Sequence, residues 1–122
     1  MTKILLVEDN EMNRDMLSRR LKKRGYEVVM AFDGQEGLDK IKDGGFDLIL
    51  LDIEMPKLTG HEVLEKVRAF DQDLPIMMVT SRNKPSEIEK LINAGADEYV
   101  MKPFTQDILI NKMEDTLERE IA

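Results

Sequence analysis

The sequence predicts an α/β fold in which helices cover both faces of a parallel β-sheet. Short apolar runs alternate with segments of helical periodicity along the 122 residues, as in parallel sheets with right-handed crossovers. The run 48–51 is apolar at every position, which indicates a strand that is buried on both faces. Polar residues stand where four of the runs end, and such sheets bind ligands beyond the carboxyl ends of their strands.

Five runs are expected to form the strands. They cover residues 3–7, 26–30, 47–52, 75–80 and 98–101. Pro75 is compatible with the fourth run, because the first residue of a strand tolerates a missing N–H group. The polar residues at the strand ends are Glu8, Asp9, Asp52, Thr80 and Lys102.

The segments that follow these runs are expected to form five helices. Residues suited to a helix start are Asn10, Asp33, Pro85 and Thr105, and glycines suited to a helix end are Gly25, Gly44 and Gly95. The segment 55–60 is expected to be irregular, with a tight backbone at Gly60. Helical spacing of apolar residues predicts these inward side chains: Met16, Leu17, Leu21, Leu38, Ile41, Val63, Leu64, Val67, Ile88, Leu91, Ile92, Ile108, Leu109, Met113 and Leu117.

Composition narrows the class of protein. A chain of this length is expected to form one domain, and we expect a single domain over residues 1–122 without an output domain. The net charge of -7 argues against direct binding to nucleic acid or to an anionic membrane surface. The sequence contains no cysteine, which excludes disulfides and thiolate metal sites. No run has the length of a signal peptide or a membrane span, so we expect a cytoplasmic protein.

Three carboxylates, those of Glu8, Asp9 and Asp52, would converge if the first and third strands are neighbours. Two carboxylates ~5 Å apart repel each other by roughly 3 kcal/mol at an effective dielectric constant near ~20, so the group needs positive charge. Lys102 supplies one charge, and a hard divalent cation supplies the rest. Oxygen ligands together with water fit Mg²⁺. Glu54 lies nearby in the sequence and can add its backbone carbonyl as a ligand.

An aspartate beside Mg²⁺ can attack a phosphoryl group and form an acyl phosphate, and Asp52 is the candidate for this role. Thr80 can donate its hydroxyl to the new phosphoryl oxygens, and Lys102 can pair with them. Taken singly, these residues have ordinary explanations, because a strand-end Asp or Thr is often a cap and a lone Lys is usually solvated. Their combination at strand ends favours the functional interpretation.

Five short motifs stand in the expected order at these strand ends. They are Val7-Glu8-Asp9-Asn10, Asp52-Ile53-Glu54-Met55-Pro56 through Gly60, Val79-Thr80-Ser81, Ala94-Gly95-Ala96 and Tyr99-Val100-Met101-Lys102-Pro103-Phe104. With them the chain resembles the receiver domain of two-component response regulators, the family of the bacterial chemotaxis receiver, from Lys3 to about Leu117. The resemblance implies a flavodoxin-like (βα)5 doubly wound sheet with strand order 2-1-3-4-5.

The resemblance also implies a function in two-component or phosphorelay signal transduction. Asp52 would accept a phosphoryl group from a histidine kinase or a histidine phosphotransfer protein. Mg²⁺ would be held by Glu8, Asp9, Asp52 and the backbone carbonyl of Glu54. The protein would be a phosphoryl acceptor and not an ordinary enzyme, although it would accept phosphoryl groups from small donors and lose them by autodephosphorylation.

Further residue roles follow from the same resemblance. Thr80 and Lys102 would bind the phosphoryl group, and the small Ser81 would leave access to it. Tyr99 would be a switch aromatic that turns inward with Thr80. The bond between Lys102 and Pro103 would be cis and aim the lysine into the site. Glu54 and Arg82 lie where the family tunes the lifetime of the acyl phosphate.

Phosphorylation would shift an equilibrium between an inactive and an active form. The responding face would consist of the helix after Pro85, the strand 98–101 and the last helix, and it would bind a downstream protein target. The chain would be a monomer or a phosphorylation-dependent dimer. Met12 is expected to be exposed near the site, where a phosphodonor partner could pack.

Three alternatives remain open from the sequence. The chain could be a receiver from a longer DNA-binding regulator or hybrid kinase. It could also be a flavodoxin-like module that holds a mononucleotide, although the acidic loop 8–11 would repel a phosphate without a metal. The third alternative is a phosphatase with an aspartate nucleophile. That family has the motif Asp-x-Asp at the nucleophile, whereas this chain has Asp52-Ile53-Glu54.

Overall fold

Five parallel strands form a single sheet in the order β2-β1-β3-β4-β5. The computed structural model describes residues 1–55, 57–81 and 84–121. The strands are β1 (Lys3–Val7), β2 (Glu27–Ala31), β3 (Leu48–Asp52), β4 (Ile76–Thr80) and β5 (Glu98–Met101). The predicted fold class and strand order are therefore confirmed.

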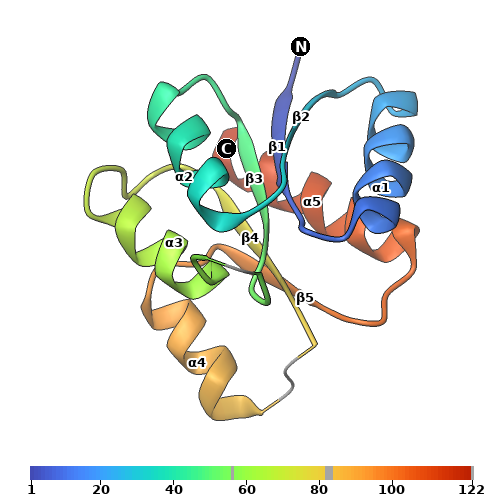
Figure 1. Cartoon of the computed structure of the whole chain (residues 1–122). Coiled ribbons are helices and arrows are strands. Elements are labelled where there is room, and N and C mark those ends of the chain that lie inside the picture. The colour runs from blue at the N-terminus through green and yellow to red at the C-terminus, as the bar shows by residue number, and fades with distance from the viewer. Residues whose placement is uncertain (56, 82–83, 122) are drawn as a thin grey trace.

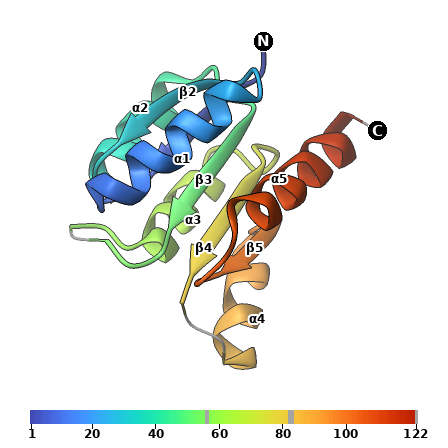
Figure 2. The ribbon, with the colours of Figure 1, turned by 90° about the vertical axis from the view of Figure 1, so that its right-hand side faces the viewer.

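Helices cover both faces of this sheet. They are α1 (Glu11–Lys23), α2 (Gly34–Asp43), α3 (Gly60–Arg68), α4 (Pro85–Asn93) and α5 (Gln106–Ile121). Figures 1 and 2 show α1 and α5 on one face and α2, α3 and α4 on the other. Within the described residues, none of the helices combines the length and the apolar character that a membrane crossing requires.

Helix starts lie where the sequence predicts them. The side chain of Asn10 accepts the N–H of Asn13 at 3.0 Å, and Asp33 accepts the N–H of Glu36 at 2.8 Å. These bonds satisfy N–H groups that have no partner within the helix. Pro85 is the first residue of α4, where its missing N–H costs nothing.

Alternation along the strands divides the core into two layers. Leu5 and Leu51 belong to the apolar cluster under α2, α3 and α4. Leu6 and Leu50 belong to the cluster under α1 and α5. Successive side chains of a strand point to opposite faces, so the residues at and just after a strand end also take opposite sides. This alternation decides where the polar side chains of the site point.

Three helical side chains predicted to face the core are exposed instead. Met16 is 53%, Ile92 46% and Ile108 49% exposed. In α1 the buried stripe is narrower than the apolar pattern, and it runs through Arg14, Leu17, Ser18 and Leu21. In α5 the inward positions are taken by Leu109, Ile110 and Met113. An apolar residue beside such a stripe faces water, because the stripe alone contacts the sheet.

Candidate functional site

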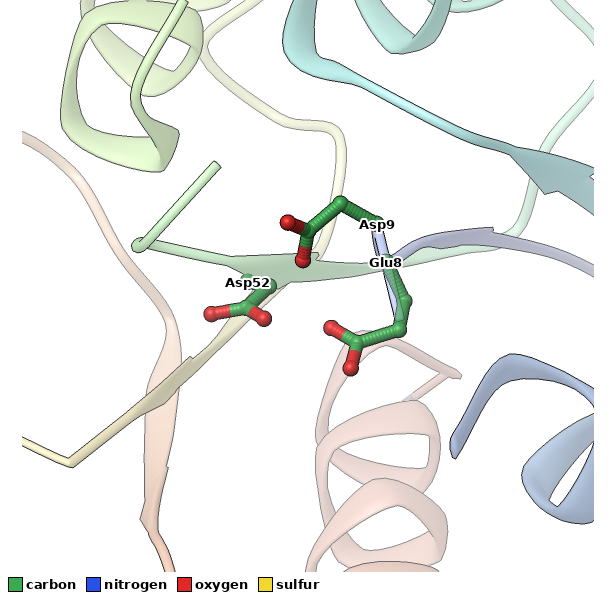
Figure 3. Close-up of side chains that lie close together, drawn as sticks. All are labelled: Glu8, Asp9 and Asp52. Atoms are coloured by element: carbon green, nitrogen blue, oxygen red, sulfur yellow. The ribbon is translucent and has the colours of Figure 1, made fainter. Parts of the chain in front are cut away.

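Three carboxylates converge at the C-terminal edge of the sheet. Glu8 and Asp9 follow β1, and Asp52 is the last residue of β3. These two strands are neighbours, with Val7 paired to Leu51. One carboxylate oxygen from each of the three residues lies within 4.8 Å of the other two, and Figure 3 shows the side chains grouped beside the strand ends. The predicted convergence is confirmed.

The alternation of the strands places these side chains in two pockets. Glu8 and Asp52 border a pocket of about 430 Å³ between the sheet and helices α1 and α5. Asp9 borders a pocket of about 600 Å³ on the side of α3 and α4, together with Thr80. Glu8 and Asp52 are only 5% and 2% exposed, whereas Asp9 is exposed. The cluster therefore straddles the edge of the sheet.

Lys102 provides the positive charge that the sequence predicted. It follows β5, and its Nζ lies 2.9 Å from Oδ2 of Asp52. Its backbone N–H donates to the carbonyl of Thr80 at 2.7 Å, and its peptide bond to Pro103 is cis, as the resemblance implied. Burial lowers the pKa of the Lys102 ammonium, but the hydrogen bond and charge of Asp52 outweigh this effect and raise the pKa overall.

The backbone after β3 holds the other oxygen of Asp52. The N–H of Glu54 donates to Oδ1 of Asp52 at 3.1 Å. The N–H of Gly60 donates to the carbonyl of Ile53 at 2.9 Å. A Cβ atom on Gly60 would contact the carbonyl of Asp52 and lie 2.7 Å from Cα of Ile53. The tight backbone predicted at Gly60 is thus confirmed, and it brings the start of α3 against Asp52.

The surroundings of Glu8 raise the pKa of its carboxyl group. Burial, followed by the hydrogen bond and charge of Asp52, raises the pKa of Glu8 to about 8. The amide of Asn13 donates to Oε1 of Glu8 at 3.1 Å and opposes this effect, as does the charge of Lys102. In the metal-free protein Glu8 is therefore mainly protonated at neutral pH and can donate to Asp52. A bound cation would displace this proton.

The other predicted residues surround this cluster. Thr80 is fully buried at the end of β4, and Ser81 is exposed and donates from Oγ to Oε1 of Glu54 at 2.5 Å. Tyr99 is partly buried and packs against the core layer under α2, α3 and α4. Met12 is 72% exposed on α1, as expected. Arg82 lies outside the described residues.

Two residues of α1 that contact the site were not predicted from the sequence. Asn13 binds the carboxyl of Glu8, and Arg14 donates from Nη1 to the carbonyl of Glu8 at 2.9 Å. Arg14 is 9% exposed, although arginine in a surface helix is usually solvated. A charged residue at a core-facing position three residues before Leu17 was the available signal.

The donor set fits a hard divalent cation. The three carboxylates offer oxygen only, and hard cations such as Mg²⁺ prefer oxygen ligands. The chain contains no cysteine that would favour a softer metal. The mutual repulsion of three carboxylates within 4.8 Å gives a cation an electrostatic advantage at this position.

Comparison with known proteins gives the same picture. The chain matches the response regulator receiver domain family over residues 4–114. It is 41% identical over 117 residues to the response regulator MprA of Mycolicibacterium vanbaalenii, a match that covers 96% of this chain and 51% of that protein. The chain thus spans about half the length of the curated relatives it matches.

Solved structures of similar proteins share the fold. A CheY-like response regulator receiver domain protein from Methanospirillum hungatei is 35% identical, with a TM-score of 0.93 and coverage of 98% of this chain and 96% of that one. The response regulator TrrA of Thermotoga maritima, solved with Mg²⁺ and BeF, is 37% identical, with a TM-score of 0.85 and coverage of 95% and 99%.

Proposed function

The chain belongs to the response regulator receiver domain family, and from this membership we propose that Asp52 accepts a phosphoryl group in a reaction that requires Mg²⁺. One observation carries the proposal: Asp52 is a buried carboxylate that lies beside two more carboxylates and 2.9 Å from an ammonium group. The Mg²⁺–BeF complex of the similar TrrA protein supports the same chemistry here.

The reaction would form a mixed anhydride on the Asp52 side chain. A carboxylate oxygen of Asp52 attacks the phosphorus atom of the donor, an O–P bond forms, and the bond from phosphorus to the donor breaks with its electron pair on the leaving group. The leaving group takes up a proton from solvent. Mg²⁺ would neutralise part of the phosphoryl charge. It would be held by Glu8, Asp9, Asp52 and the backbone carbonyl of Glu54.

Lys102 and Thr80 would then bind the phosphoryl oxygens. The ammonium of Lys102 already lies 2.9 Å from Asp52 and would pair with the added negative charge, a strong charge-assisted contact. The Thr80 hydroxyl would donate to another phosphoryl oxygen from the end of the neighbouring strand. Ser81, whose hydroxyl binds Glu54, is small enough to leave access to the site.

The new contacts would bias an existing conformational equilibrium. Moving such an equilibrium from 1:99 to 99:1 takes roughly 5.5 kcal/mol of differential interaction, which a few charge-assisted hydrogen bonds can supply. We propose that Thr80 and Tyr99 transmit the change to the face formed by α4, β5 and α5. The net charge of -7 argues against nucleic acid as the target of this face and so supports a protein, and membership of the receiver family supports a histidine kinase or phosphotransfer protein as the donor.

The test compares protein variants after incubation with Mg²⁺ and a small phosphodonor. Intact mass should show the addition of one phosphoryl group to the wild type and none to Asp52→Asn. The exposed Asp39, which binds Gln35 on α2, offers a matched control, and Asp39→Asn should be labelled like the wild type. A chelator should prevent labelling of the wild type and of Asp39→Asn. Full labelling of Asp52→Asn would refute the assignment.

A further inference from the structure

A buried arginine contacts the backbone of the loop that carries two of the carboxylates. Nη1 of Arg14 donates to the carbonyl of Glu8 at 2.9 Å and, more weakly, to the carbonyl of Asp9 at 3.4 Å. The residue is 9% exposed, and its bond to Glu8 is buried, whereas its bond to Asp9 is partly buried. An arginine that gives its donors to main-chain carbonyls sets backbone geometry, because the guanidinium is a rigid plane.

The position of these two carbonyls determines what the contact does. The carbonyl of Glu8 belongs to the peptide plane before the Cα atom of Asp9, and the carbonyl of Asp9 belongs to the plane after it. Two fixed planes leave the dihedral angles φ and ψ of Asp9 little freedom. The direction in which the Asp9 side chain leaves the backbone is therefore set by Arg14.

An aromatic ring holds the guanidinium in this position. The guanidinium carbon of Arg14 lies 4.0 Å from the ring centroid of Phe32. Phe32 directly follows β2, which is the neighbour of β1, and Ala31 at the end of β2 accepts the N–H of Glu8 at 3.1 Å. The ring is 53% exposed and covers Arg14 from the solvent side. Such cation–π contacts favour a planar guanidinium parallel to the ring.

We propose that Arg14, held by Phe32, is a positioning residue of the cation site. The inference rests on the proposed function, because it assigns to Arg14 the task of presenting Asp9, and through the loop Glu8, to Mg²⁺. Outer-shell contacts that orient metal ligands typically contribute about 10- to 100-fold in metal affinity. Loss of the Arg14 contacts should therefore weaken Mg²⁺ binding at least about tenfold.

A purely electrostatic role and a positioning role of Arg14 predict opposite changes in Mg²⁺ affinity when the residue is replaced. If Arg14 acted only through its positive charge, its removal would strengthen Mg²⁺ binding, because a nearby cation repels Mg²⁺. If Arg14 only stabilised the fold, its removal would leave the dissociation constant of the folded protein unchanged. Only a positioning role predicts that the folded variant binds Mg²⁺ more weakly.

The chain offers a matched control in Arg68. This arginine also donates to main-chain carbonyls, to Gly95 at 2.8 and 3.0 Å and to Asp71 at 3.1 Å. It joins the end of α3 to the turn before β5 and contacts none of the three carboxylates of the cluster. Its side chain is 11% exposed. Arg68→Met should therefore reduce stability without changing the affinity for Mg²⁺.

The experiment measures the Mg²⁺ dissociation constant of the full chain by isothermal titration calorimetry. Arg14→Met, which keeps the apolar stem, should weaken binding at least about tenfold. Arg14→Lys, which keeps the charge, should also weaken binding, and Phe32→Leu should do so by about two- to fivefold. Arg68→Met should bind like the wild type.

Several outcomes would overturn the inference. An unchanged or tighter dissociation constant in Arg14→Met, or equal weakening in Arg68→Met, would show that Arg14 does not position the site. If Arg14→Met does not fold, wild-type affinity in both Arg14→Lys and Phe32→Leu would have the same meaning. Absence of Mg²⁺ binding by the wild type would overturn the proposed cation site together with this inference, whereas the other outcomes leave the proposed function intact.

Discussion

Glu8 and Asp52 are both buried carboxylates at strand ends, but they face different partners. The ammonium of Lys102 lies 2.9 Å from Asp52, whereas the uncharged amide of Asn13 binds Glu8. A cation stabilises the charged form of a carboxylate far more than an amide does. Burial and the neighbouring Asp52 raise the pKa of Glu8, so Glu8 holds a proton at neutral pH, whereas Asp52 is the member of the pair that contacts the ammonium group.

The raised pKa of Glu8 predicts how stability depends on pH in the metal-free protein. Its pKa is raised from 4.5 to about 8 on folding, so the folded protein holds a proton that the unfolded chain has lost between these values. Stability contributed by Glu8 then falls as pH rises. The unfolding free energy of the wild type, relative to Glu8→Gln, should fall by about 1 kcal/mol per pH unit between roughly pH 5 and 7.

Urea unfolding of both proteins in chelator, at three pH values in this window, measures the difference. Gln keeps the shape of the side chain and a donor toward Asp52 but does not titrate. The contributions of the other carboxylates to the pH dependence therefore cancel when the two proteins are compared. Parallel pH profiles for the two proteins would contradict the raised pKa.

Single residues of the site were predictable where a strand end fixes them. Glu8, Asp9 and Asp52 lie together because parallel strands bring their carboxyl ends to one edge, and this needs only the strand pattern. Arg14 was not predictable, because its contacts run to the backbone of Glu8 and to Phe32 on a different strand end. Its position three residues before Leu17 indicates that it faces the core, but the local sequence does not show which groups it contacts there.

At the scale of elements, the connection from β3 to α3 holds the site together. Gly60 begins α3 and lies so close to the end of β3 that any side chain would collide with the backbone of Asp52 and Ile53. Thr59 caps the helix with a reciprocal pair of hydrogen bonds to Glu62. The helix start is thus fixed at one position relative to Asp52.

We expect Gly60→Ala to reduce stability by about 2 to 3 kcal/mol, because backbone on both sides must move to accept the methyl group. Gly25→Ala provides the comparison, since Gly25 has a φ of 94° but no atom within 4 Å of the added Cβ. It should cost about 1 kcal/mol from backbone strain alone. The phosphorylation rate of the folded protein should fall only in Gly60→Ala, and equal rates in both variants would contradict this role of Gly60.

The sequence predicted the positions of the strands and helices better than it predicted which helical side chains face the core. Strands β1 and β5 have the predicted bounds, and β2 ends one residue later, at Ala31, because Ala31 pairs with Val7. The exposed side chains of Ile92 and Ile108 could not be distinguished from core residues by spacing. The width of a buried stripe depends on how each helix lies on the sheet, which is a property of the assembled layers.

At the scale of the whole molecule, the site is an edge where two layers meet. Glu8 and Asp52 border the pocket under α1 and α5, and Asp9 and Thr80 border the pocket beside α3 and α4. Figure 3 shows Glu8 and Asp9 extending to opposite sides of the strand end, so a ligand held by both would contact both sides of the sheet. Binding there would link layers that are otherwise separated by the buried strands.

This arrangement predicts that Mg²⁺ stabilises the entire domain. The cation would bind the folded chain, in which the three carboxylates converge, and not the unfolded chain. At a concentration tenfold above its dissociation constant it should add about 1.4 kcal/mol to the unfolding free energy, which raises the melting temperature by a few degrees. Calorimetry should show no such rise for Asp9→Asn, or for the wild type in NaCl of equal ionic strength. A rise of equal size in Asp9→Asn would place the cation elsewhere.

The most direct test identifies the side chain that carries the phosphoryl group. Borohydride reduces an acyl phosphate to an alcohol, so a phosphorylated aspartate becomes homoserine, and tandem mass spectrometry of peptides can locate it. After incubation with Mg²⁺ and a small phosphodonor, we predict homoserine at position 52 and unmodified residues at positions 8, 9 and 54. A reduced residue at any of those three positions, with Asp52 unmodified, would contradict the assignment of Asp52 as the phosphoacceptor.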